Sequence, residues 1–118
     1  VDPLTVSRDA ATYQDLIRRS KGEFTVAKEL NVRLASGWFS DRAACYLAAG
    51  RPVITQDTGF GRLLPTGKGL FAVRNLDDAV AACAAIAADF EARARAARQI
   101  AEDYFAAPRV LEELLSAV

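Results

Sequence analysis

The sequence predicts an α/β domain with a short, largely parallel sheet, flanking helices and a helical C-terminal tail. Three observations predict this class. Short apolar runs, such as residues 53–55, are rich in β-branched residues, as strands covered on both faces prefer. Stretches in which apolar residues recur at helical spacing lie between these runs. Strands that alternate with helices are typically parallel, because a connection of helix length can join neighbouring parallel strands.

The amino-terminal third predicts a helix and a strand with less regular segments on either side. Residues 1–6 are expected to be a linker or the end of a strand, and the chain is expected to be a fragment of a longer protein. Ser7 is expected to cap a helix that runs to about Arg19. After a turn, residues 23–27 predict a short strand. For residues 28–36, a loop and a broken extended segment both remain open.

The central stretch, residues 40–55, predicts a helix, a tight turn and a buried strand, around which the rest is organised. Ser40 is a favoured N-cap, because its hydroxyl can accept a hydrogen bond from an amide of the first turn. Asp41 suits the positive end of the helix dipole. Gly50 stands where a left-handed residue ends a helix, and Pro52 prevents the helix from continuing.

The second half predicts one more strand and then helices. The glycines and the proline of residues 61–69 favour a loop. It is not a phosphate-binding P-loop, because five residues rather than four separate Gly61 from Gly67. Residues 70–73 predict the third strand, and Asn75 is expected to cap the next helix.

Three helical segments are expected after Asn75. The first carries a stripe of residues at helical spacing that is expected to face the core: Val80, Cys83, Ile86, Ala87 and Phe90. The second, residues 90–105, has the mixed charges of a solvated face. Pro108 breaks it, and a closing amphipathic helix follows, with Val110, Leu111, Leu114 and Leu115 as its apolar residues.

The composition limits the possible classes of function. The 118 residues suffice for one domain, and 15 basic and 15 acidic residues leave no basic excess for a nucleic-acid surface. The absence of histidine excludes histidine-based acid–base chemistry. No apolar run reaches the roughly 18 residues of a membrane span, and no signal peptide is expected. Cys45 and Cys83 are expected to be free, buried thiols in the cytoplasm, with a disulfide as the minor alternative.

The segment SGWFSDRAACYLAAGRPVITQDTGF, residues 36–60, resembles the donor-binding half of GT-B glycosyltransferases. In that family, a helix, an Ala-Gly-Arg/Lys-Pro-Val turn and strand, and a Thr/Val-Gly loop form part of the nucleotide-sugar pocket. The segments SKGEF and LPTGKGLFAV extend the resemblance from about residue 20 to the end of the chain. It implies that residues 1–118 are a partial Rossmann-like domain, the C-terminal fragment of a two-domain enzyme.

The resemblance implies that the chain takes part in the transfer of a sugar from a nucleotide-diphosphate donor to an unknown acceptor. The donor is a substrate, so no cofactor is implied, and GT-B enzymes work without a metal. Without an acceptor-binding domain, the fragment alone is expected to be inactive. The implied partners are the two substrates, together with the missing N-terminal domain or another copy bound through an open sheet edge.

Two segments are expected to bind the diphosphate: residues 40–42 at the start of the central helix, and the loop of residues 58–60 after the central strand. Helix N-termini and strand exits suit phosphates, because free amides and the helix dipole favour negative charge there. Arg42 is expected to contact phosphate, and Asp41 a sugar or ribose hydroxyl. The substrate-binding candidates are Ser40, Asp41, Arg42, Thr58, Gly59, Phe60 and Lys28, with Lys21 and Glu23 as weaker candidates. No catalytic residue and no metal ligand is assigned.

The chain departs from the family pattern at two positions. Many retaining members carry a pair of glutamates where Gly37 and Cys45 stand here. Neither a retaining nor an inverting outcome is therefore assigned. The alternative function is a non-catalytic protein-interaction module derived from a transferase half, which would pair with another chain through an open sheet edge.

Overall fold

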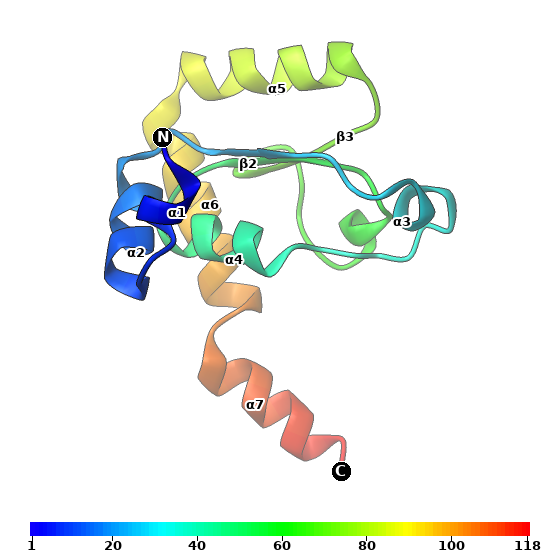
Figure 1. Cartoon of the computed structure of the whole chain (residues 1–118). Coiled ribbons are helices and arrows are strands. Elements are labelled where there is room, and N and C mark those ends of the chain that lie inside the picture. The colour runs from blue at the N-terminus through cyan, green and yellow to red at the C-terminus, as the bar shows by residue number, and fades with distance from the viewer.

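Three short strands form a parallel sheet at the centre of the computed structural model, which describes residues 1–118 (Figure 1). The strands β1 (Glu23–Thr25), β2 (Val53–Gln56) and β3 (Leu70–Val73) lie side by side in that order. The predicted α/β class, with a short parallel sheet, flanking helices and a helical tail, is confirmed. All three predicted strands are present, although β1 ends two residues earlier than predicted.

Helices cover both faces of this sheet. α4 (Asp41–Ala48) and α6 (Phe90–Tyr104) pack together on one face, and α5 (Leu76–Ala88) covers β2 and β3 on the other (Figure 1). The remaining elements are α1 (Pro3–Val6), α2 (Ala10–Arg19), α3 (Glu29–Arg33), the 3-10 turn η1 (Phe60–Arg62) and α7 (Ala107–Ser116). None of these helices has both the length and the apolar character needed to cross a membrane.

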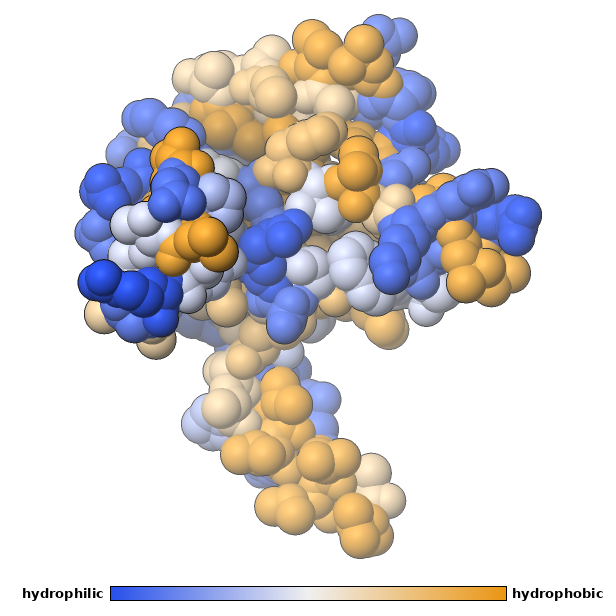
Figure 2. Space-filling model, in the orientation of Figure 1, coloured by the Kyte–Doolittle hydropathy of each residue, from blue (hydrophilic) through white to orange (hydrophobic).

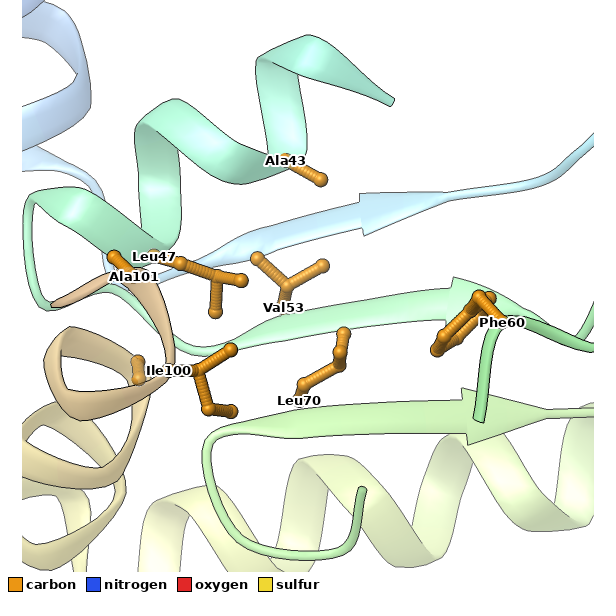
Figure 3. Packing of buried hydrophobic residues seen from close by; sticks show 8 residues of the cluster. Ala43, Leu47, Val53, Phe60, Leu70, Ile100 and Ala101 are labelled. Atoms are coloured by element: carbon orange, nitrogen blue, oxygen red, sulfur yellow. The ribbon is translucent and has the colours of Figure 1, made fainter. Parts of the chain in front are cut away.

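The larger hydrophobic core lies on the face that α4 and α6 cover. Its eight buried residues are Ala43, Leu47, Val53, Phe60, Leu70, Ala97, Ile100 and Ala101. The side chains of Leu47, Val53 and Leu70 meet between the helix and the sheet (Figure 3) and are completely buried. Burying one such side chain stabilises the fold by about 1.5–3 kcal/mol. This core fixes the start of α4 relative to the carboxyl ends of β2 and β3.

Two glycines allow connecting segments to fit against this core. Gly50 ends α4 with a φ of +67°, the left-handed conformation that the sequence predicts for it. Gly69 lies against α6, where an added Cβ would come within 2.2 Å of the backbone nitrogen of Ala97. Only a residue without a side chain can approach that helix so closely.

The amino-terminal region differs from its prediction in three places. Residues 1–6 contain the helix α1 and are neither a linker nor the end of a strand. α2 is capped by Asp9 instead of Ser7, because the Asp9 carboxylate accepts hydrogen bonds from both the amide and the hydroxyl of Thr12. Residues 28–36 contain the helix α3, so neither of the two alternatives left open there is correct.

The predicted core stripe of α5 is wrong at Val80, Cys83 and Ala87, which are exposed, whereas Ile86 does pack against the smaller core. Ala79 and Ala82 are the residues that α5 buries, whereas Val80 and Cys83 are exposed. Small side chains let the helix lie closer to the sheet than a stripe of larger residues would. Cys45 is exposed as well, so both thiols are free, as predicted, but neither is buried.

Candidate functional site

The carboxyl ends of the strands bring together two of the segments predicted to bind substrate. The loop before α4 lies against the exit of β2, since the Gly37 amide donates to the Thr58 carbonyl oxygen (2.8 Å). The Thr58 hydroxyl donates in return to the carbonyl oxygen of Trp38 (2.6 Å). The start of α4 and the loop that contains Gly59 are therefore neighbours at one edge of the sheet.

The buried side chains of Thr58 and Phe60 stabilise this edge of the sheet. Their side chains are almost completely buried, with exposures of 1% and 2%. The Phe60 ring packs edge-on against Phe39, with 5.3 Å between ring centroids. Between them, Gly59 has a φ of +90°, and its amide donates to the carboxylate of Asp57 (2.8 Å). Of the three predicted residues in this loop, only Gly59 lies near the surface, and its amide is already bonded.

The first turn of α4 has backbone donors without partners. Ser40 occupies the N-cap position, as predicted, but its hydroxyl accepts no hydrogen bond from the helix. The Asp41 carboxylate accepts only the neighbouring Arg42 amide (2.8 Å). The amides of Asp41 and Ala43 make no hydrogen bond. Unbonded amides at the positive end of a helix suit an anionic group.

Arg42 is engaged within the fold on one side. Its Nε donates to Oε1 of Glu23 (2.5 Å), and its Nη2 donates to the hydroxyl of Thr25 (2.7 Å). The hydrogen bond to the Glu23 carboxylate, more than any other contact, raises the pKa of the Arg42 guanidinium. The Glu23 side chain is 5% exposed and that of Arg42 is 50% exposed. Half of the Arg42 side-chain surface thus remains open to solvent near the start of α4.

The two predicted lysines lie at opposite ends of β1. Lys28 is exposed and directly precedes α3, beyond the carboxyl end of the strand. Lys21 precedes the strand, and its ammonium lies 5.1 Å from the centre of the Phe90 ring. The structure therefore places Lys28 at the same edge as α4 and Lys21 at the other edge.

A cavity of about 240 Å³ opens at the carboxyl ends of all three strands, on the side of α5. Phe24, Val26 and Leu76 form its apolar wall, and Gln56, Arg74 and Asn75 supply polar groups. Gln56 and Arg74 were not predicted as site residues. Gln56 ends β2 and Arg74 directly follows β3, and a polar residue at the end of a buried β-branched or apolar run is a signal that could have identified both.

No group of His, Cys, Asp and Glu side chains in residues 1–118 is arranged to hold a metal ion. Comparisons with family models, curated proteins and solved structures find no match to this chain. The residues of the site itself define its chemistry. These are two unbonded amides, a half-exposed arginine side chain, a free lysine and a carboxylate at one edge of a parallel sheet.

Proposed function

We propose that this chain binds a nucleotide-diphosphate sugar at the carboxyl edge of its sheet, as the donor-binding part of a GT-B-like glycosyltransferase. The observation that supports this most directly is the unbonded amide of exposed Asp41 at the start of α4, beside the Gly59 loop. The order of the segments in the sequence, which resembles that family, gives the second support. The transfer itself, to an unknown acceptor, belongs to a longer chain, and this fragment alone is inactive.

Each residue has a definite role in this proposal. The unbonded amide of exposed Asp41 donates a hydrogen bond to the diphosphate, whose negative charge the dipole of α4 favours. The solvent-facing side of Arg42 neutralises the charge that develops on the leaving diphosphate. The Asp41 carboxylate accepts a hydrogen bond from a sugar or ribose hydroxyl. Lys28 adds positive charge, and the cavity beside Gln56 and Arg74 takes an uncharged part of the donor.

The proposal assigns no catalytic residue. Gly37 lies in the loop before α4, and Cys45 is exposed on α4 itself. Gly37 has no side chain and Cys45 has no carboxylate, so neither residue can take the place of a glutamate. Retention and inversion both remain compatible with the proposal. A cytoplasmic location is part of the same proposal, because that is where nucleotide sugars would be available to it.

Calorimetric titration with UDP, GDP and their sugar conjugates tests the site. Asp41→Ala removes the carboxylate only, whereas Asp41→Pro also removes the first amide; proline is well accepted at this helical position. We expect Asp41→Pro to weaken binding at least about tenfold more than Asp41→Ala. Ala10→Pro, at the equivalent position of α2, is the control and should leave binding unchanged.

Binding that is equal in the wild type and in both Asp41 variants would place the ligand elsewhere and overturn this site. Absence of binding to every nucleotide would instead favour the second candidate, a non-catalytic interaction module. One observation favours that candidate independently, since the edge of β1 that faces away from β2 has no neighbouring strand.

A further inference from the structure

α7 is an amphipathic helix whose apolar side has no partner in the chain. None of its residues is buried, and its four large apolar side chains are between 43% and 72% exposed: Val110, Leu111, Leu114 and Leu115. Arg109, Glu112, Glu113 and Ser116 line the opposite side. Figure 2 shows the apolar surface of α7 on a helix that projects from the body of the molecule. A single helix of 10 residues is marginal in water, so a covering surface would stabilise it.

The same chain carries an apolar groove with no occupant. It lies between the free edge of β1 and α5 and has a volume of about 490 Å³. Its apolar lining includes Phe24, Ile54, Cys83, Ile86 and Phe90. Phe24 is 61% exposed, because β1 is an edge strand with no neighbour on its outer side. An amphipathic helix laid into an apolar groove is a common mode of recognition.

α7 cannot reach the groove of its own chain. Phe90 lines the groove at the start of α6, and the 15 residues of this helix then lead away for about 22 Å. At its far end Phe105 stacks on Phe39, which packs against the core on the α4 face. α7 begins only two residues later. It therefore starts on one side of the sheet while the groove lies on the other (Figure 1).

The charges around the two surfaces are complementary. The Lys21 ammonium and the Arg51 guanidinium lie 5.1 Å and 5.9 Å from the centre of the Phe90 ring, at one end of the groove. Neither forms an ion pair within the chain. On α7, Glu112 and Glu113 flank the apolar side chains, one on either side, and Glu113 also pairs with Arg109 of the same helix (3.4 Å). An acidic helix would thus supply the charge that this end of the groove lacks.

We propose that α7 of one copy of the chain docks into the groove between β1 and α5 of a second copy. The leucines of α7 then lie against Phe24 and Phe90, and its glutamates lie beside Lys21 and Arg51. If two copies exchange α7 reciprocally, the assembly closes as a two-fold dimer. This association is independent of the proposed donor binding, because the groove and the carboxyl edge involve different residues.

Sedimentation or light scattering across protein concentrations tests the association with four matched variants. Leu114→Glu lies on the apolar side of α7 and Ala87→Glu lines the groove, and both positions are exposed. Each should reduce the mass about twofold, to the 12.7 kDa of one chain. Ser116→Glu on the polar side of α7 and Ala84→Glu on the outer side of α5 should keep the wild-type mass. Circular dichroism checks that every variant is folded.

A wild-type protein that stays monomeric at all concentrations would overturn the proposal. So would an association that Leu114→Glu abolishes while Ala87→Glu leaves it intact, because α7 would then have another partner surface. Assemblies larger than a dimer that respond to both variants would support the contact, arranged head to tail.

Chemical cross-linking locates the contact directly. Cys83 provides a native exposed thiol in the groove, and Cys45→Ser removes the other. In this background we expect Leu114→Cys to give a covalent dimer with a short bis-maleimide, and Ser116→Cys to give markedly less. Cross-linking within one chain, or equal yields for the two variants, would contradict docking between copies.

Discussion

The two faces of the sheet are built differently, although one set of strands supplies both. The α4 and α6 face buries eight hydrophobic residues, among them Leu47, Leu70 and Phe60 (Figure 3). The α5 face buries four, and the two that come from the helix are alanines. Since stabilisation grows with the apolar area removed from water, most of the stability resides on the first face.

This difference separates the region that holds the fold from the regions free to bind. Because α5 contributes alanines, it lies close to β2 and β3 but leaves its larger side chains, such as Val80, exposed. It also leaves the groove beside β1 open. The α4 and α6 face, which we call the closed face, fixes the start of α4, where the exposed residue Asp41 carries an unbonded amide. Substitutions on the closed face should therefore lower the free energy of unfolding much more than substitutions on the α5 face.

The largest expected effect is the loss of a side chain from the closed face. Leu47→Ala removes a completely buried side chain from the larger core and should lower the free energy of unfolding by about 2–5 kcal/mol. Val80→Ala on α5 removes a side chain that is 59% exposed and should change it by less than about 0.5 kcal/mol. Urea unfolding followed by circular dichroism measures both. Equal losses would show that the two faces contribute alike.

The next effect tests how closely the closed face is packed. Gly69→Ala places a methyl group against the backbone of α6 at Ala97 and should cost about 1–3 kcal/mol of unfolding free energy. Gly61→Ala is the matched control, because its added Cβ would meet only ordinary van der Waals contact at Thr66. Thermal unfolding of the two variants compares them. A Gly69→Ala protein as stable as Gly61→Ala would mean that α6 can shift away from the sheet.

The closed face was the easier one to predict from sequence. Its central segment carries several local signals that agree, and Gly50, Pro52 and the β-branched run at Val53 place a turn and a strand correctly. Local signals of this kind depend on the chain within a few residues. For the same reason the fold class could be predicted, since it follows from the alternation of such segments.

The orientation of α5 could not be predicted in the same way. Alanines surround its larger residues, so Ala79 and Cys83 are almost equally plausible as core positions by hydrophobicity. The choice depends on the distance between the helix and the sheet, which is a property of the tertiary structure. Likewise, the burial of Thr58 depends on its bond to Trp38, 20 residues away. By contrast, Gln56 ends β2 and Arg74 directly follows β3, so both could have been identified.

A third effect concerns the margin of the closed face, where Arg42 pairs with buried Glu23. Arg42→Ala leaves that carboxylate without its cation and should lower the free energy of unfolding by about 1–2 kcal/mol. This loss is smaller than that for a fully buried pair, because the Arg42 side chain is half exposed. Arg109→Ala, whose partner Glu113 is 70% exposed, should cost less than about 0.5 kcal/mol. Chemical denaturation measures both. Adding Glu23→Gln to Arg42→Ala should restore part of the lost stability, because the unpaired charge is removed. If the double variant is no more stable than Arg42→Ala, the loss comes from packing and not from the unpaired carboxylate.

The smallest effect lies at the outer edge of the same face, where α2 packs beside α4. Hydrogen bonds from the Thr12 amide and hydroxyl lower the pKa of the Asp9 carboxyl below its usual 3.8. A lowered pKa in the folded state means that the charged carboxylate stabilises α2 above pH 3.8 and that this contribution is lost as the pH falls through the lowered value. Asp9→Ala should therefore lower the melting temperature slightly at neutral pH and not in strong acid. The control is Ser7→Ala, at the cap position that the sequence predicts, and its effect should not depend on pH in this way. An Asp9→Ala difference that persists unchanged in acid would mean that the side chain acts by packing and not as a charged cap.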